Sequence, residues 1–433
     1  MSELTKAVQK MKSIRSQLAS LSTDVKNKAL LEMSKVLFES RSEIETANQK
    51  DLERAETEGL AAPLLARLKF QGSKIRGVCE GLELTARLED PVGRVMSCRE
   101  LDTGLELFQV ACPLGTIGMI FESRPDALVQ IASLCVKSGN AVVLKGGSEA
   151  SETNQVLAKL LVQAGQSSGL PDGWLFLAQS RAEVGELLSL NEYVDLLIPR
   201  GSNEFVQYIM KNTTIPVMGH ADGLCHGYID SNADVEMAVS LCVDSKTQYV
   251  AVCNAMETLL IHSDIARYVL PPLKIALESR GVELRGCSKT REIFPTMIAA
   301  DEQDWESEYL DLILSIKIVT SLDKAITHIN TYGSGHTDMI VTRDLKTAKI
   351  FMEQVDSANV FWNASTRFAD GFRYGFGAEV GVSTGKLHAR GPVGLEGLVT
   401  YKWKLYGDGH LVSDYAGTDP KSFTHRKLDK KPR

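Results

Sequence analysis

The feature that most constrains the fold is an apolar run that ends in a glycine-rich turn and leads into a helix. Residues 141–148 read Ala-Val-Val-Leu-Lys-Gly-Gly-Ser, and apolar residues then recur at helical spacing over 149–164. Residues 194–202 repeat the pattern before a helix-like stretch over 203–211. Strand, turn and helix repeated in this way are typical of parallel βαβ units. The sequence therefore predicts an α/β fold.

The second half of the chain shows the same alternation and predicts a second doubly wound unit. The expected helices cover 234–244, 264–280, 322–332 and 344–353, and the expected strands cover 258–261, 313–319 and 338–341. Before the first unit, residues 3–60 have helical spacing. Residues 94–112 predict a hairpin around Asp102-Thr-Gly104, because alternating residues flank a turn signal.

Length and composition fit a multidomain cytosolic protein. The 433 residues correspond to two or three domains, and the net charge of −7 argues against nucleic acid or an anionic membrane as the main partner. No apolar stretch is long enough to predict a membrane span. The eight cysteines are scattered without a C-x-x-C pair, which favours free thiols in a reducing compartment and offers no metal-binding motif.

Two turns after predicted strands are candidate anion sites. Gly146, Gly147 and Gly201 would let a ligand approach the backbone, and Ser148 and Ser202 follow them. The helix that begins after each turn points free N–H groups at the same place, which favours phosphate. Most glycine pairs after a strand are ordinary turns, however, so the pattern alone leaves both interpretations open.

Cys253 is the candidate nucleophile, because it lies where an apolar stretch meets a new segment. A thiolate near a helix N-terminus would be stabilised by the helix dipole and by free backbone N–H groups, which could also receive an oxyanion. Buried structural thiols are the ordinary alternative, which we keep for Cys79, Cys98, Cys112, Cys135, Cys242 and Cys287. Cys225 and His226 are adjacent, but neighbours on a strand face opposite ways, so they predict neither a metal site nor a dyad.

Two arginines lie in settings that suit anion binding. Arg124 follows a predicted strand and precedes Pro125, which would start a helix. Arg367 lies in a polar loop after the apolar residues 360–362. Arginine binds carboxylates and phosphates through two parallel hydrogen bonds. A surface ion pair is an equally open interpretation of each.

Six blocks along the chain together resemble the γ-glutamyl phosphate reductase family. They are Phe121-Glu-Ser-Arg-Pro, Leu134-Cys-Val-Lys-Ser-Gly-Asn-Ala-Val-Val-Leu-Lys-Gly-Gly, Leu197-Ile-Pro-Arg-Gly, Cys253-Asn-Ala-Met-Glu-Thr-Leu-Leu, Asn363-Ala-Ser-Thr-Arg-Phe and Leu387-His-Ala-Arg-Gly-Pro-Val-Gly-Leu-Glu. The resemblance runs from about residue 5 to residue 410. The stretch around Cys253 and the tail resemble the reductase half of the bifunctional pyrroline-carboxylate synthases, whose kinase half is absent here.

The resemblance implies a domain organisation, because the family belongs to the aldehyde dehydrogenase superfamily. That fold has two doubly wound Rossmann-like domains and a small β-arm through which subunits associate. The implied divisions are a cofactor-binding domain over 1–93 and 113–233, a catalytic domain over 234–392, an arm over 94–112 and 393–410, and a loosely held tail over 411–433. A homodimer or a tetramer is therefore expected.

The resemblance also implies the reaction, which is NADPH-dependent reduction of L-glutamyl 5-phosphate to L-glutamate 5-semialdehyde in proline biosynthesis. Cys253 falls on the family nucleophile, which would expel phosphate and carry the acyl group as a thioester. Arg124 and Arg367 would bind the anionic groups of the substrate, with Ser123 and Asn363 from the same two blocks facing it.

For the cofactor, Lys145 falls on the superfamily lysine that reaches the adenosine ribose. Ser148 stands where NAD-preferring members often carry glutamate, which favours NADPH, although Glu149 follows directly. Gly201 and Ser202 match the turn that faces the pyrophosphate. Asp311 matches the acidic residue near the nicotinamide ribose, and an ordinary surface carboxylate is an equal alternative.

Two departures from the hydrolytic aldehyde dehydrogenases favour reduction. Their general-base glutamate lies in a segment that reads Val-Met-Gly-His-Ala-Asp-Gly at 217–223, without a glutamate. An enzyme that must preserve its thioester has no use for an activated water. Their oxyanion asparagine is also missing, with Ser123 near its place. The backbone N–H of Cys253 and the amide of Asn254 are the expected substitutes.

Two rival functions stay open at this point. One is an NADP-linked hydrolytic aldehyde dehydrogenase, which the missing glutamate opposes. The other is a non-catalytic scaffold for a glutamate kinase, which the presence of Cys253 opposes. Association of an active enzyme with a separate glutamate kinase is a further expectation, because acyl phosphates are labile.

Overall fold

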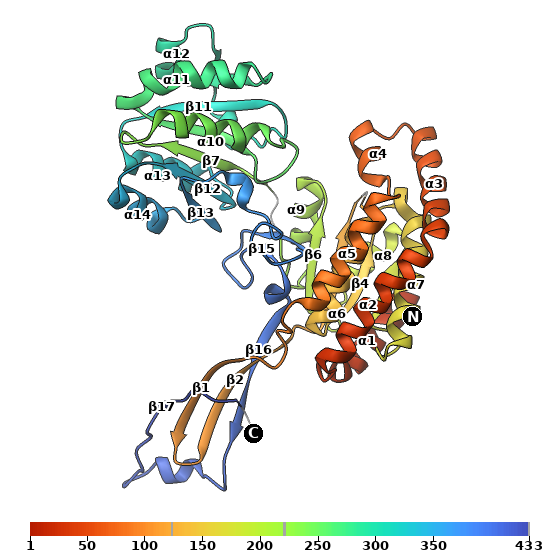
Figure 1. Cartoon of the computed structure of the whole chain (residues 1–433). Helices are drawn as coiled ribbons and strands as arrows, with labels where there is room; N and C mark the ends of the chain where they lie inside the picture. The colour runs from red at the N-terminus through yellow and green to blue at the C-terminus, as the bar shows by residue number, and fades with distance from the viewer. Residues whose placement is uncertain (123, 220–221, 432–433) are drawn as a thin grey trace.

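Figure 1 shows the computed structural model, which describes residues 1–122, 124–219 and 222–431. The N-terminal helices and a four-stranded parallel sheet form one body. A seven-stranded parallel sheet with its helices forms a second body, and a narrow antiparallel sheet projects away from both. The doubly wound α/β fold expected from the sequence is therefore confirmed.

The first body is built on the sheet β5-β4-β3-β6, in which all neighbours are parallel. Its strands are β3 (Thr116–Phe121), β4 (Ala141–Lys145), β5 (Leu175–Ala178) and β6 (Leu196–Arg200). Its connecting helices are α6 (Pro125–Ser138), α7 (Ser151–Ser167), α8 (Arg181–Leu188) and α9 (Asn203–Lys211). The first five helices of the chain pack beside them: α1 (Glu3–Ala19), α2 (Thr23–Glu39), α3 (Arg41–Thr57), α4 (Ala62–Leu68) and α5 (Ser73–Arg87).

Local sequence explains why this body forms. Every residue of β3 and β4 is buried, as expected for parallel strands that are covered on both faces. Helix α6 begins at Pro125, whose fixed φ suits a first helical position, and it ends at Gly139, whose φ of 72° is left-handed. Twelve residues of α6 are buried, so this helix lies inside the body between the sheet and the N-terminal helices.

The second body is built on the parallel sheet β10-β9-β11-β8-β7-β12-β13. Its strands are β7 (Cys225–Ile229), β8 (Met256–His262), β9 (Glu283–Gly286), β10 (Ile298–Ala299), β11 (Ile313–Val319), β12 (Thr337–Val341) and β13 (Asn359–Trp362). Its helices are α10 (Val235–Thr247), α11 (Ser263–Glu278), α12 (Ser288–Ile293), α13 (Leu322–Tyr332) and α14 (Leu345–Gln354). A two-stranded sheet of β14 (Gly381–Ser383) and β15 (Gly391–Val393) follows in the chain.

The division between the two parallel sheets falls before Cys225. Strand β7 pairs with β8 and β12 in the seven-stranded sheet, whereas our expected boundary lay at 233/234. The difference arises because β7 is a fully buried run of five residues whose sequence carries no sign of which sheet it joins.

The projecting sheet has the antiparallel order β16-β2-β1-β17. It joins β1 (Val95–Asp102) and β2 (Leu105–Pro113) to β16 (Val399–Tyr406) and to β17 (Arg426–Lys427). The last strand comes from the segment that we expected to be a loosely held tail. Tyr415 and Lys430 of this segment also donate hydrogen bonds to Asp102 and Glu106, at 2.8 and 2.5 Å. No helix in the described ranges combines the length and apolar character that crossing a bilayer requires.

Candidate active site

The candidate nucleophile lies at the amino end of the seven-stranded sheet. Strands β8, β7 and β12 are neighbours and run parallel, so the residues just before them meet at one edge. Cys253 precedes β8, Cys225 begins β7, and His336 precedes β12. The sheet therefore brings together three chemically active side chains that are far apart in the sequence.

Cys253 is in contact with a histidine that the sequence did not single out. The Sγ atom of Cys253 lies 3.1 Å from Nε2 of His336, which is fully buried. On the other side of the ring, Nδ1 lies 2.8 Å from the hydroxyl oxygen of Thr337. A base within hydrogen-bond distance of a thiol, held by a third group, is the arrangement that activates a nucleophile. The signal in the sequence was a histidine in Gly333-Ser-Gly-His, directly before a predicted strand.

The backbone around Cys253 is a tight turn and not a helix N-terminus, so our expectation of a stabilising helix dipole was wrong. Helix α10 ends at Thr247, and the N–H of Ala255 donates to the carbonyl of Val252 at 3.1 Å. Cys253 and Asn254 are therefore the two central residues of the turn. Among the described residues, their backbone N–H groups have no acceptor, so both are available to an oxyanion.

The side chain of Asn254 holds the loop that carries Arg367. Its Nδ2 donates to the carbonyl of Ala369 at 2.8 Å, and the Thr366 hydroxyl donates to the carbonyl of Asn254 at 2.7 Å. The Oδ1 atom of Asn254 is buried without a hydrogen-bond partner among the described residues. One amide hydrogen is thus committed to Ala369, and the side chain fixes the turn against the 3₁₀-helix η3 (Thr366–Phe368).

Two further residues, Gly223 and Cys225, pack directly against Cys253. A Cβ atom on Gly223 would lie 2.5 Å from the Cα, Cβ and carbonyl oxygen of Cys253, so no side chain fits there. The thiol of Cys225 donates to the carbonyl of Cys253 at 3.1 Å and lies 3.7 Å from Nδ1 of His336. Burial raises the pKa of Cys225 well above its ordinary value, which keeps this second thiol protonated. His226, its neighbour, points elsewhere and bonds to Asp338 at 3.1 Å.

The two expected residues of the 363–367 block have different surroundings. Arg367 is 8% exposed and donates from Nε to Oε1 of Gln248 at 2.9 Å. Burial lowers the pKa of Arg367, whereas the charge of Cys253 acts in the opposite direction, so the two groups are close enough to interact. Asn363 instead uses both ends of its amide on the backbone of Thr342, each at 3.0 Å. Its side chain therefore holds the loop and does not face the thiol.

The expected cofactor turn after β4 is held from outside by helix α3. Lys145 is buried, and its ammonium donates to the carbonyl of Gly146 at 2.5 Å. Arg54 donates to the carbonyls of Ser148 and Glu149, at 3.1 and 3.3 Å. Ser148 begins the 3₁₀-helix η1 (Ser148–Ala150), which leads into α7. Arg54 is thus a cation beside the loop that we assigned to the adenosine ribose, and no pattern in the sequence indicated this contact.

The same loop ends at a cap provided by α3. The carboxylate of Asp51 is fully buried and accepts from the N–H groups of Glu152 and Thr153, at 3.2 and 2.8 Å. The Thr153 hydroxyl donates to it as well, at 2.7 Å. Orphan donors at the start of α7 are therefore satisfied by a residue a hundred positions earlier.

The second cofactor turn follows β6 as expected. Ser202 is the N-cap of α9, and its hydroxyl accepts from the N–H of Phe205 at 3.4 Å. A Cβ on Gly201 would meet the carboxylate of Glu122 and the ring of Phe205 at 3.0 to 3.2 Å. Burial, and next the charge of Glu149, raise the pKa of Glu122, so the turns after β4 and β6 come close together.

The acidic residue beside this second turn is Glu308, three positions before the expected Asp311. The amide of Asn203, in the first turn of α9, donates to Glu308 at 2.9 Å and to Asp222 at 2.6 Å. Asp311 is exposed, and its carboxylate accepts from the N–H of Leu312 at 2.7 Å. The contact across the two bodies is therefore made by Glu308.

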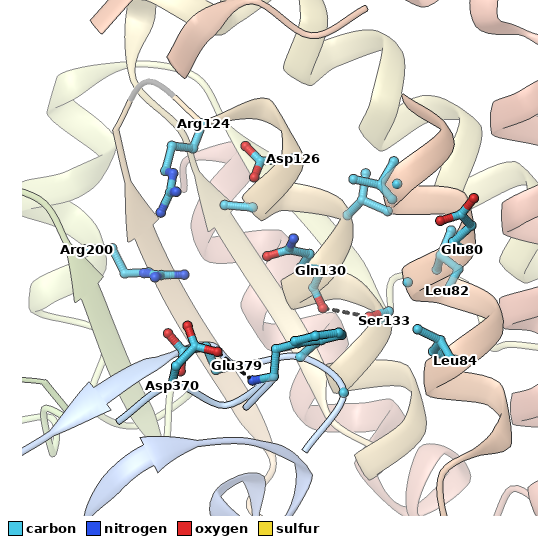
Figure 2. Close-up of a pocket in the computed structure, with 18 residues that line it drawn as sticks. Glu80, Leu82, Leu84, Arg124, Asp126, Gln130, Ser133, Arg200, Asp370 and Glu379 are labelled. Atoms are coloured by element: carbon cyan, nitrogen blue, oxygen red, sulfur yellow. Dashed lines mark hydrogen bonds between the residues drawn. The ribbon is translucent and has the colours of Figure 1, made fainter. Parts of the chain in front are cut away.

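A cavity of about 380 Å³ lies at the carboxyl ends of β3 and β6, next to Arg124 (Figure 2). Helices α5 and α6 form one wall and the loop around 370–379 forms the other. Its charged lining residues are Glu80, Arg124, Asp126, Arg200, Asp370 and Glu379. Ser123, which we expected to face the substrate, lies outside the described residues.

Comparison with known proteins gives the family of the chain. A model of the aldehyde dehydrogenase family matches residues 2–283. A γ-glutamyl phosphate reductase of Pelotomaculum thermopropionicum is 59% identical over 430 residues, which are 99% of this chain and 98% of that protein. One from Acetivibrio thermocellus is 59% identical over 414 residues, 96% of each chain.

Solved structures show the same relationship. The crystal structure of a γ-glutamyl phosphate reductase from Thermotoga maritima matches with a TM-score of 0.93 at 40% identity, over 95% of this chain and all of that one. An acetylating aldehyde dehydrogenase from Geobacillus thermoglucosidasius shares the fold, with a TM-score of 0.64 at 18% identity over 94% of this chain and 97% of that one. The chain therefore belongs to the aldehyde dehydrogenase family, within the group formed by the γ-glutamyl phosphate reductases.

Proposed function

We propose that this oxidoreductase reduces L-glutamyl 5-phosphate to L-glutamate 5-semialdehyde with NADPH, through a thioester on Cys253. The observation that carries the proposal is the contact between Cys253 and His336 beside two buried or cavity-facing arginines, Arg367 and Arg200. The relatives named γ-glutamyl phosphate reductase support the substrate and a role in proline biosynthesis.

His336 acts first, as the base that takes the proton of the thiol. The thiolate sulfur then attacks the acyl carbon, so a C–S bond forms and the bond from that carbon to the phosphate oxygen breaks. Phosphate leaves with the electron pair of the broken bond. Arg367, which lies within electrostatic reach of Cys253, stabilises this anion. During attack, the free N–H groups of Cys253 and Asn254 receive the charge that develops on the acyl oxygen.

The described residues fit a nicotinamide dinucleotide. Gly146 and Gly201 keep side chains away from both turns, Ser202 begins the helix that suits the pyrophosphate, and Arg54 and Ser148 suit a ribose phosphate. The bound reduced cofactor supplies the hydride that converts the thioester carbon to the aldehyde level. His336, protonated in the first step, is placed to return its proton to the sulfur when the aldehyde leaves.

The rival functions are weaker. Asp222 and Gly223 end the segment in which hydrolytic relatives would carry their glutamate, and Asp222 is bonded to Asn203. A scaffold without activity would not need a histidine at 3.1 Å from the thiol.

Two assembly properties are part of the proposal. Strand β16 pairs with β2 on one side only and exposes Tyr401, Trp403 and Leu405, so we propose that the projecting sheet joins subunits into a dimer or tetramer. A separate glutamate kinase is proposed as a partner, because handing over a labile acyl phosphate directly would limit its hydrolysis. A reducing cytoplasmic setting fits the eight free cysteines.

The test runs the reaction in reverse. The protein is mixed with L-glutamate 5-semialdehyde, phosphate and either NADP or NAD, and absorbance of the reduced cofactor is followed. We expect phosphate-dependent reduction of NADP that falls by at least about 10⁴-fold in Cys253→Ala, because the covalent route is then closed. Reduction without phosphate would instead indicate a hydrolytic dehydrogenase. Absence of cofactor reduction with both NADP and NAD would support the alternative of a non-catalytic scaffold.

A further inference from the structure

The cavity at the carboxyl ends of β3 and β6 carries two arginines, Arg124 and Arg200, and it is also lined by the carboxylates of Glu80, Asp126, Asp370 and Glu379. Arg200 is the last residue of β6, and its register partner Phe121 ends β3, three residues before Arg124. Neither guanidinium group forms an ion pair or a hydrogen bond with another described residue. In Figure 2, Arg200 lies between Arg124 and the carboxylates of Asp370 and Glu379.

The electrostatics of the pair call for a ligand. Burial, and next the charge of Arg124, lower the pKa of Arg200, whereas Glu379 and Cys253 act in the opposite direction. Two like charges that share a cavity repel each other. Asp126 and Glu379 offset this repulsion without forming a direct ion pair with Arg200, so an anion between the two guanidinium groups would stabilise both. Cys253 also lies within electrostatic range of Arg200, although it is not among the residues that line the cavity.

The carboxylates on the far side of the cavity are not equivalent. Asp370 is occupied by its own loop, since it accepts from the N–H groups of Phe372 and Arg373 and pairs with the guanidinium of Arg373 at 3.5 Å. Glu379 accepts from the N–H of Gly371 through Oε2 alone, at 2.8 Å, and Oε1 has no partner among the described residues. Burial raises the pKa of Glu379 and Arg200 opposes this rise.

We infer that this cavity binds the α-amino-acid end of the substrate, with the α-carboxylate between Arg124 and Arg200 and the α-ammonium group on Glu379. The inference rests on the proposed function and deepens it, because it states how the enzyme selects an amino-acid acyl phosphate. A phosphate group would need only cations, and the adjacent free carboxylate oxygen of Glu379 would repel it. A zwitterion matches both signs. The phosphate is thereby left to Arg367, which does not line this cavity.

The first test measures binding without catalysis. L-Glutamine keeps the α-carboxylate and α-ammonium groups of the substrate and carries a neutral amide in place of the acyl phosphate. Its binding to the full chain is followed by calorimetry. We expect affinity to fall about 10- to 100-fold in Arg200→Gln and in Glu379→Gln, because each loses one charge-assisted contact. Arg343→Gln is the matched control, since Arg343 is 69% exposed on the second body. Equal affinity in all four proteins, or no binding to the wild type, would overturn the inference.

The second test assigns each charge with four aldehydes in the reverse assay: L-glutamate 5-semialdehyde, 5-oxopentanoate without the ammonium group, 4-aminobutanal without the carboxylate, and butanal with neither. Arg200→Gln should lower kcat/KM about 10- to 100-fold for the two carboxylates relative to the other two, mainly through KM. Glu379→Gln should do so for the two amines. If Arg200→Gln does not fold, Arg200→Lys replaces it in the same comparison, because lysine keeps the positive charge and loses the two parallel N–H donors.

The outcomes separate this inference from the proposed function. Equal losses on all four aldehydes would reject the amino-acid site while phosphate-dependent turnover by the wild type still supports the reductase. Conversely, charge-selective binding of L-glutamine in a protein that shows no phosphate-dependent turnover would support the site and reject the reductase.

Discussion

The two parallel sheets carry their candidate sites at opposite ends. In the sheet β5-β4-β3-β6, the candidate ligand sites follow the carboxyl ends of β3, β4 and β6, as is usual for doubly wound folds. In the seven-stranded sheet, Cys253, Cys225 and His336 lie at the amino ends of β8, β7 and β12. The bond from Asn203 to Glu308 links the two regions. The comparison teaches that one sheet offers candidate binding surfaces at its helix N-termini, whereas the other holds the candidate nucleophile through the loops that enter its strands.

Replacement of His336, at the amino end of β12, tests most strongly whether this end of the second sheet activates Cys253. We expect His336→Gln to lower kcat about 10²- to 10⁴-fold, because the thiol loses its base while a polar side chain remains. The rate of Cys253 alkylation by iodoacetamide should fall in parallel. His425→Gln, on the exposed last segment, is the control. Unchanged alkylation in His336→Gln would mean that Cys253 does not depend on this end of the sheet.

Gly223 tests whether the turn that carries Cys253 at this edge of the sheet can move without loss of activity. Gly223→Ala should lower kcat about 100-fold with little change in cofactor binding, because a Cβ at 2.5 Å from Cys253 must displace the turn. Gly219→Ala is a matched control, since its nearest neighbours are at 3.7 Å or beyond and its Cβ would make an ordinary contact. Equal activity of Gly223→Ala and Gly219→Ala would show that displacement of the Cys253 turn does not impair catalysis.

Cofactor selectivity tests the carboxyl-end sites of the first sheet. Arg54→Gln should lower the NADPH to NADH ratio of kcat/KM about 10-fold, because the loop at Ser148 loses its nearby cation. Glu149→Gln should raise the ratio, because a repelling carboxylate is removed. Arg41→Gln, at the exposed start of the same helix, is the control. If the NADPH to NADH ratio of kcat/KM changed in none of the variants, the 2′-phosphate of NADPH would have to be recognised by other residues.

The smallest expected effect concerns stability against acid, which should differ between the two bodies. Burial, and next the charge of His226, lower the pKa of His328 from 6.5 to about 3. The unfolded chain therefore binds this proton at a higher pH than the folded one does. The stability that His328 contributes is complete above pH 6.5 and is lost as the pH falls toward 3.

Urea unfolding at pH 7.5 and pH 5.5 measures this effect. We expect the free energy of unfolding to fall by about 1 kcal/mol between these pH values. His328→Gln should remove this fall, and His425→Gln, at an exposed position, should preserve it. Hydrogen exchange should place the acid-induced opening in the second body, because His328 lies in α13. Opening of the first body at the same pH would contradict this.

Sequence reasoning succeeded where the signal was local. The turns at Gly146 and Gly201 follow buried strands and precede helices, so adjacent residues define them. Cys253 was singled out by its local setting and by a family block, and its role as nucleophile stays a prediction. Its surroundings were misjudged, however, because the periodicity that indicates a helix does not separate a helix N-terminus from a turn three residues before a strand.

The remaining parts of the site depend on strand pairing. His336 is 83 residues from Cys253, and only the neighbouring positions of β8, β7 and β12 bring them together. Arg200 was passed over because it ends a strand in a turn that was assigned to the cofactor. Glu308 and Asp311 lie in one short polar segment, where an exposed carboxylate and a carboxylate that contacts the other body look alike in the sequence, and the cofactor role of Asp311 stays a prediction.

The cap that Asp51 provides to α7 has a consequence for synthesis of the chain. Asp51 leaves the ribosome 102 residues before Thr153. Its carboxylate accepts a hydrogen bond from the backbone N–H of Thr153. Helix α3 can therefore be complete when the cofactor loop emerges, and the loop meets its acceptor as soon as it is translated. The acceptor for the start of α7 is thus made before α7 itself, which links assembly of this candidate cofactor turn to the order in which the protein is built.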